Sequence, residues 1–307
     1  METGRKMVNQ AIILAAGRGS RLGAVLHNGK PKCLLEINGK PLISYQIQIL
    51  RSLGIKRIGV VVGHGAGHVY EALDKDISFV VNPRYADTNS LFSLWLAGAW
   101  VEGPFMLMNS DLLVHPKIYE RVINNKNTCL AYDSSSGDED EHMKIRLEGN
   151  LVRAISKSLP LEHSAGENVG IIKFEETEAC DVMGEADRLV RSGKTDHWSP
   201  AAIDGIVNRR HFEAVDIADL PWTEIDFPED WENACKNIWP KVEKHLQYGH
   251  AHRPHPVPHT RPTRLTPHHP AQAPINPVAP SQHRRIASGL GMAASRSIYR
   301  IPAWPMT

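Results

Sequence analysis

The sequence has no apolar stretch long enough to cross a membrane and no cysteine spacing typical of a disulfide or metal site. The longest apolar run near the amino end, residues 11–16, is far shorter than the roughly 20 residues of a membrane-spanning helix, and too short for a signal-peptide core. The cysteines form no CxxC pair and lie far apart, at Cys33, Cys129, Cys180 and Cys235. We therefore expect a soluble, cytoplasmic protein with no membrane partner.

An excess of one charge is also missing, since 35 Lys and Arg face 34 Asp and Glu. This balance hides two unlike parts. Residues 249–307 hold seven Arg, eleven of the 21 Pro and no acidic residue, a composition that predicts a disordered tail. Residues 1–248 then keep 28 basic against 34 acidic side chains, and such an acidic domain argues against a nucleic-acid partner.

Short buried strands alternate with helices in the first part of residues 1–248, which we interpret as one α/β domain. Residues 10–15, 58–62, 77–81 and 105–108 are short apolar runs, as expected of strands buried on both faces. Residues 42–53 carry apolar side chains at helical spacing. This alternation predicts a Rossmann-like, doubly wound sheet that is mostly parallel.

Beyond Asp111 the alternation is looser and indicates a mixed sheet. Strands are expected over 128–132, 144–147, 151–156 and 170–174, and a helix over 176–191. A further strand end at 222–226 and a helix over 229–246 complete the predicted domain. We expect this half to bind the acceptor of a transfer reaction.

A glycine-rich loop, residues 17–23, follows the first strand and has the composition of a phosphate-binding turn. Gly17 and Gly19 allow backbone N–H groups to approach a polyphosphate, while Arg21 and Lys32 supply positive charge. Leu22 stands where a dinucleotide-binding fingerprint needs its third glycine. The loop therefore predicts a triphosphate clamp and argues against an NAD-dependent oxidoreductase.

Together with residues 82–94, NPRYADTNSLFSL, this loop resembles the signature of nucleoside-diphosphate-sugar pyrophosphorylase-like nucleotidyltransferases. Within them it is most similar to the branch of bacterial phosphocholine and 2-aminoethylphosphonate cytidylyltransferases. The resemblance covers about residues 11–246. It implies a fold of the nucleotide-diphospho-sugar transferase type and transfer of CMP from CTP to a small phosphonate or phosphomonoester, with release of pyrophosphate.

The resemblance also implies roles for individual residues. Arg21 and Lys32 would be catalytic, stabilising charge on the transferring phosphate and on pyrophosphate. Asp111 and Asp226, at two strand ends, would hold Mg²⁺, which prefers hard carboxylate oxygens. The nucleotide would be bound by Ala16, Gly17, Gly19, Ser20, Arg21, Lys32, Tyr85, Asn89, Ser90 and Asp111.

The acceptor is predicted from the second half. Lys144 and Lys157 are candidates to hold a phosphate or phosphonate, and Glu167 to pair with an ammonium group. Residues 134–142 are acidic and polar where a choline site would need an aromatic cage, which favours 2-aminoethylphosphonate. Phosphocholine, a sugar 1-phosphate with UTP or dTTP, and a non-catalytic nucleotide-binding regulator stay as alternatives. A homodimer is one of the oligomeric states left open.

Overall fold

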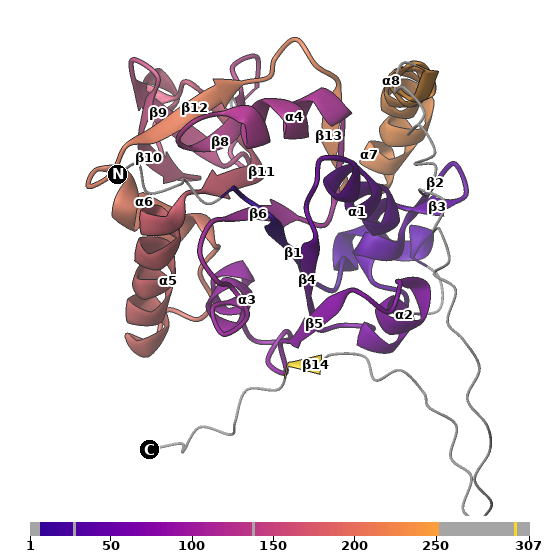
Figure 1. The fold of residues 1–307 in the computed structure, drawn as a ribbon, viewed down its shortest axis with the longest axis horizontal. Coiled ribbons are helices and arrows are strands. Elements are labelled where there is room, and N and C mark those ends of the chain that lie inside the picture. Colours follow the sequence, from indigo (N-terminus) through magenta and orange to yellow (C-terminus); the bar gives the residue numbers. More distant parts are fainter. Residues whose placement is uncertain (1–6, 27–28, 137–138, 252–297, 300–307) are drawn as a thin grey trace, which may run out of the picture.

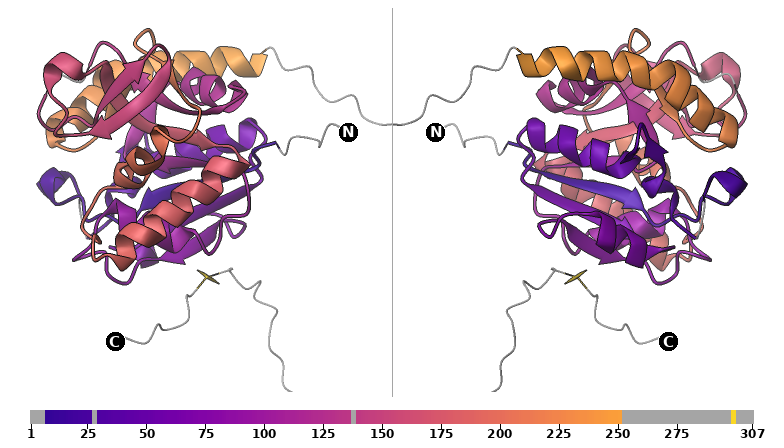
Figure 2. Two further views of the ribbon diagram at one scale, coloured as in Figure 1. Left: turned by 90° about the vertical axis from the view of Figure 1, so that its left-hand side faces the viewer. Right: turned by 90° about the vertical axis from the view of Figure 1, so that its right-hand side faces the viewer.

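A mixed sheet forms the centre of the protein, and helices cover both of its faces (Figures 1 and 2). The computed structural model describes residues 7–26, 29–136, 139–251 and 298–299. Across these residues ten strands pair in the order β14-β5-β4-β1-β6-β11-β8-β12-β10-β9. Their bounds are β1 (Gln10–Ala15), β4 (Arg57–Val62), β5 (Ser78–Val81), β6 (Phe105–Asn109), β8 (Thr128–Asp133), β9 (Lys144–Glu148), β10 (Leu151–Ser156), β11 (Gly166–Phe174), β12 (Phe212–Asp216) and β14 (Ile298–Tyr299).

Two short antiparallel pairs and the helices surround this sheet. The pairs are β2 (Glu36–Ile37) with β3 (Lys40–Pro41), and β7 (Leu112–Val114) with β13 (Trp222–Glu224). The α-helices are α1 (Leu42–Ser52), α2 (Ala66–Ala72), α3 (Ser90–Ala97), α4 (Pro116–Asn124), α5 (Glu176–Arg191), α6 (Pro200–Val207), α7 (Pro228–Asn233) and α8 (Trp239–Ala251). In the described ranges, none of the helices combines the length and the hydrophobicity that crossing a membrane requires.

The first half of the sheet is parallel, as the alternation of strands and helices predicts. β5, β4, β1 and β6 all run in one direction. Successive residues of β1 point to opposite faces, so Ile13 lies in the core beneath α1 and its neighbour Ile12 in the core beneath α3 and α5. The carboxyl ends of β1 and β6 therefore meet at one edge, where ligands bind in sheets of this kind.

The second half is mixed and closes on itself. β11 lies antiparallel to both β6 and β8, while β12 is parallel to β8. β11 also pairs with β9 through Gly166 and Glu167, so β11, β8, β12, β10 and β9 form a ring. This ring stands beside the carboxyl ends of the parallel strands.

Several elements differ from the sequence predictions. β7, α4, α6 and β12 were not predicted, and each has nine residues or fewer. The missed signal was clearest in α4, which is amphipathic and buries Ile118, Tyr119 and Val122. The predicted helix over 229–246 begins at Pro228 and changes to a π-helical turn over Ala234–Ile238. Between β2 and β3 the chain makes a tight turn at Asn38–Gly39, a dipeptide that favours positive φ, and φ is 51° and 73° there.

Most of the predicted tail, including residues 252–297 and 300–307, lies outside the described residues. Gly249 to Ala251 continue α8, and Ile298–Tyr299 pair in parallel with Phe79 and Val80 on the outer edge of β5 (Figure 1). Both segments lie within residues 249–307, for which the sequence predicts a disordered tail. The placement of the domain boundary at residue 248 stays a prediction.

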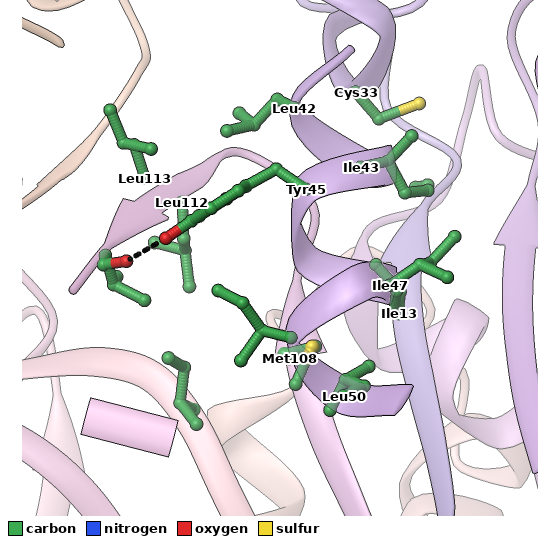
Figure 3. Close-up of a cluster of buried hydrophobic side chains, with 14 of the residues drawn as sticks. Ile13, Cys33, Leu42, Ile43, Tyr45, Ile47, Leu50, Met108, Leu112 and Leu113 are labelled. Atoms are coloured by element: carbon green, nitrogen blue, oxygen red, sulfur yellow. Dashed lines mark hydrogen bonds between the residues drawn. The ribbon is translucent and has the colours of Figure 1, made fainter. Parts of the chain in front are cut away.

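Helix α1 connects the sheet to the turn that carries Asp111. Its apolar side chains pack over Ile13 and Met108, and the hydroxyl of Tyr45 donates to the carbonyl of Val114 at 3.3 Å (Figure 3). The buried amide of Gln46 donates to the carbonyls of Asn109 and Leu112, at 3.0 and 3.2 Å. These two bonds join α1 to both sides of the turn.

Replacing this amide tests its structural role. Gln46→Leu removes both donors and leaves buried carbonyls unpaired, so we expect a loss of about 1–3 kcal/mol in the free energy of unfolding, measured by urea titration. Gln48→Leu, at an exposed position of the same helix, is the matched control and should change it by less than about 0.5 kcal/mol. Equal losses in the two variants would contradict this role.

Candidate active site

A cavity of about 300 Å³ opens beyond the carboxyl ends of β1 and β6. It brings together residues that the sequence separates by more than 200 positions. Each residue predicted to bind nucleotide or metal lines it, as do two of the three predicted acceptor residues, so its lining includes Ala16, Gly17, Gly19, Ser20, Arg21, Lys32, Tyr85, Asn89, Ser90, Asp111, Lys157, Glu167 and Asp226.

Lys144 is the predicted residue that the fold keeps away from this cavity. Its side chain is buried between β9 and its neighbours, and its ammonium group donates to the backbone carbonyl of Glu139 at 3.3 Å. At Lys144, β9 is flanked by Ser156 of β10 on one side and by Glu167 of β11 on the other. Arg146 and Glu148, farther along the strand, are exposed. The placement does not support Lys144 as a phosphate ligand.

The glycine-rich loop packs against the residue that supplies its positive charge. Gly19 adopts φ of +65°, and a Cβ built there would lie 2.9 Å from the Cβ of Lys32. A side chain at this position would therefore be strained and would displace Lys32. Lys32 is the first residue of a 3-10 turn that follows Pro31. The second residue of this turn, Cys33, is buried beside α1 and so fixes the position of Lys32 (Figure 3).

Lys32 joins the two predicted metal ligands. Its Nζ lies 2.7 Å from Oδ2 of Asp111 and 2.5 Å from Oδ1 of Asp226. Burial lowers the pKa of Lys32, but the attraction of the two carboxylates outweighs it and holds the pKa above its ordinary value. Arg21 lies 2.7 Å from the other oxygen of Asp226, so two cations meet these carboxylates.

Glu224 is a third carboxylate at this point, and it was not among the residues predicted from the sequence. Asp111, Glu224 and Asp226 each offer an oxygen within 4.8 Å of the others. Pairing of β13 with β7 produces this convergence, since Ile225 donates its N–H to the carbonyl of Asp111 at 3.0 Å. The sequence does contain a signal for Glu224, because residues two apart in an extended segment, such as Glu224 and Asp226, face the same side.

The three carboxylates fit a divalent metal. In the described part of the chain, the buried Oδ1 of Asp111 has no hydrogen-bond partner, and a bound cation would satisfy it. Burial raises the pKa of Glu224, and the charges of Asp111 and Asp226 raise it further. A hard divalent cation with oxygen ligands would relieve this repulsion.

The loop between β5 and α3 also lines the cavity, through Tyr85, Thr88 and Asn89. Asn89 caps α3 by accepting the N–H of Ser90, and the Ser90 hydroxyl accepts the N–H of Ser199 at 2.7 Å. Asn82 donates to Ser93 at 3.1 Å and so holds the loop to the helix. Asn82 and Ser93 were not among the predicted site residues, although both line the cavity and both lie in the motif of residues 82–94.

Another end of the cavity carries the acceptor candidates. The ammonium group of Lys157 lies 3.2 Å from Glu141 and 5.0 Å from the ring centre of Trp198, which is 46% exposed. Glu167 accepts a hydrogen bond from the Ser136 hydroxyl at 2.6 Å, and burial raises the pKa of Glu167. Two carboxylates and one ammonium group thus face the same space.

Comparisons with known proteins place these features in a family. Residues 11–168, half of the chain, match the MobA-like NTP transferase domain. Choline-phosphate cytidylyltransferase from Streptococcus pneumoniae is 43% identical over 187 residues, which cover 60% of this chain and 78% of that protein. CMP-5'-(3-aminopropyl)phosphonate synthase from Streptomyces rubellomurinus is 27% identical over 258 residues, or 76% of this chain, which spans only 40% of that relative's length.

Solved structures confirm the predicted fold class. The inositol-1-phosphate CTP transferase from T. maritima superposes with a TM-score of 0.66 at 21% sequence identity, over 78% of this chain and 98% of that one. At this identity the likeness concerns the fold alone. With the family match and the pneumococcal relative, it confirms the resemblance found in the sequence, and the chain belongs to the MobA-like NTP transferase domain family.

Proposed function

We propose that this protein is a metal-dependent cytidylyltransferase that transfers CMP from CTP to a small phosphonate or phosphomonoester. One observation carries the proposal: the glycine-rich loop, two cations and three carboxylates converge in a single cavity. Relatives named as a choline-phosphate cytidylyltransferase and as a CMP-phosphonate synthase support the choice of CTP.

The reaction needs positioning and charge neutralisation more than covalent chemistry. An anionic oxygen of the acceptor attacks the α-phosphorus, a new P–O bond forms, and the bond to the leaving pyrophosphate breaks. Backbone N–H groups of residues 17–20 bind the triphosphate, while Arg21 and Lys32 stabilise the negative charge that grows on the leaving group. Both cations already lie at the carboxylate cluster, so little reorganisation is needed.

Asp111, Glu224 and Asp226 would hold the metal, which we take to be Mg²⁺. When bound, Mg²⁺ would neutralise charge on the α-phosphate and orient it for in-line attack. Lys32 contributes in the same place, by keeping Asp111 and Asp226 directed toward the cavity.

The part of the cavity lining that lies between β5 and α3 would bind the nucleoside. Tyr85, Asn89 and Ser90 line it and are held in place by the cap of α3 and by Asn82. We assign this loop to the cytosine base, as the resemblance to cytidylyltransferases implies.

For the acceptor we favour 2-aminoethylphosphonate. Lys157 offers a charge to the phosphonate, and Glu141 and Glu167 offer acidic groups to a primary amine. Phosphocholine is the second candidate. The ammonium group of Lys157 lies 5.0 Å from the centre of the exposed Trp198 ring, so this ring can also contact the cation of choline.

An activity matrix tests the function. The full-length protein is incubated with each of CTP, UTP, dTTP, ATP and GTP, with Mg²⁺, and with 2-aminoethylphosphonate, phosphocholine or glucose 1-phosphate. We expect pyrophosphate release to be fastest with CTP and 2-aminoethylphosphonate. Turnover confined to glucose 1-phosphate with UTP or dTTP would refute the cytidylyltransferase assignment, and absence of turnover in every pair would refute the enzymatic one.

Removing the positive charge of Lys32 should slow the reaction. Lys32→Ala takes away a charge that is needed most in the transition state, so we expect kcat to fall by about 10²- to 10³-fold, with a smaller change in KM for CTP. The control is Lys30→Ala, whose ammonium group pairs with Glu36 outside the cavity and whose loss should leave kcat unchanged. Near-normal turnover of Lys32→Ala would refute the role given to Lys32.

The role of Glu224 can be tested by metal binding alone. Glu224→Gln keeps the size of the side chain but removes its charge, so we expect Mn²⁺, used as a spectroscopic probe, to bind about 10-fold more weakly in an EPR titration. Glu243→Gln, a change at a residue of α8 outside the cavity lining, should have no effect. Unchanged Mn²⁺ affinity in Glu224→Gln would remove Glu224 from the metal site.

A further inference from the structure

A row of alternating charges leads from the carboxylate cluster to the acceptor end of the cavity. Arg21 lies 2.7 Å from Asp226 on one side and 4.0 Å from Glu141 on the other. Lys157 lies 3.2 Å from the same oxygen, Oε2, of Glu141. One carboxylate oxygen therefore lies between two cations, one of which also contacts a candidate metal ligand.

The Glu141 side chain is poorly explained as a structural element. It is 73% exposed, and an ion pair with so much solvent contact contributes little to stability. It nevertheless lines the cavity, together with both of its cationic partners. This position resembles that of a ligand anion more than that of a fold-stabilising group.

The geometry of the row matches what an acceptor requires. Its attacking oxygen must lie near the α-phosphorus, and therefore near the carboxylate cluster that Arg21 contacts. A phosphonate carries up to two charges and three oxygens, and it can bind a guanidinium group with two parallel hydrogen bonds. It would therefore displace a single exposed carboxylate from between Arg21 and Lys157.

We propose, on the basis of the function proposed above, that Arg21 and Lys157 form the subsite for the acceptor's anionic group. Glu141 fills this subsite as an internal anion before the acceptor binds. Once displaced, the Glu141 carboxylate pairs with an ammonium group on the acceptor. The preferred acceptor class is then a short zwitterion with a phosphonate or phosphate at one end and a primary amine at the other.

Glu141 suits the ammonium better than Glu167 does. The Oε2 of Glu167 already accepts a hydrogen bond from Ser136 and lies 3.5 Å from the ring of His142. Burial also raises the pKa of Glu167, which makes it the weaker anion of the two. Glu141 has two cationic partners, and the acceptor's phosphonate takes the place of Glu141 at both.

Calorimetric titration tests this assignment without requiring turnover. The full-length protein, with Mg²⁺ and a CTP analogue whose α–β bridge cannot be cleaved, is titrated with 2-aminoethylphosphonate and with ethylphosphonate, which lacks the amine. Lys157→Met, Glu141→Gln and Glu167→Gln are compared with wild type. Glu139→Gln, an exposed acidic position close to Glu141 but outside the cavity lining, is the matched control.

We expect Lys157→Met to weaken both ligands by about tenfold or more, since each loses a charged partner of its phosphonate. Glu141→Gln should strengthen ethylphosphonate, because its internal competitor is gone, and weaken 2-aminoethylphosphonate. The ratio of the two dissociation constants should therefore change by about tenfold. Glu139→Gln should leave this ratio as in wild type.

Three results would overturn the proposal: an unchanged affinity in Lys157→Met, an unchanged ratio in Glu141→Gln, or a change of ratio that appears in Glu167→Gln instead. These outcomes are separate from those of the activity matrix. An enzyme that turns over CTP but shows no change of ratio refutes the subsite and leaves the cytidylyltransferase function standing. Binding without turnover for every nucleotide refutes the function and leaves the subsite standing.

Discussion

The ion pairs of Lys32 with Asp111 and Asp226 organise the rest of the site. Lys32 is 79 positions from Asp111 and 194 from Asp226, so its ammonium group joins three distant parts of the chain. Each part is held by its own packing. A 3-10 turn fixes Lys32, Gln46 fixes the turn of Asp111, and the pairing of β13 with β7 brings Asp226 alongside. A buried ammonium group requires such partners, because charge that is removed from water must be compensated.

The parallel half of the sheet was predictable because burial on both faces leaves a strong local pattern. The runs at β1, β4 and β6 are almost wholly apolar, and the glycines after β1 have few other interpretations. The glycine-rich loop and Lys32 come after β1 in the sequence and Asp111 comes just after β6, so predicting these strands also placed these residues. Their roles in binding and catalysis remain proposals.

The remaining features depend on contacts between distant segments. Glu224 reaches the cluster only because β13 pairs with β7, a three-residue strand too short to recognise in the sequence. Lys144 was expected at the acceptor end, but β10 and β11 flank β9 at this position and its side chain is buried, and such strand pairing cannot be read from an isolated lysine. Glu141 and Trp198 come to the cavity from loops whose paths no periodicity predicts.

The ring formed by β11, β8, β12, β10 and β9 has a consequence for the proposed acceptor site. Ile171 to Phe174 of β11 pair with β6, whereas Gly166 and Glu167 at its other end pair with β9, and the register shifts between Asn168 and Ile172. β11 thus pairs with the parallel half of the sheet at one end and with β9 at the other. Under the proposed function, substitutions in the ring would change the surroundings of the acceptor and leave the parallel strands that carry the glycine-rich loop and Asp111 as they are.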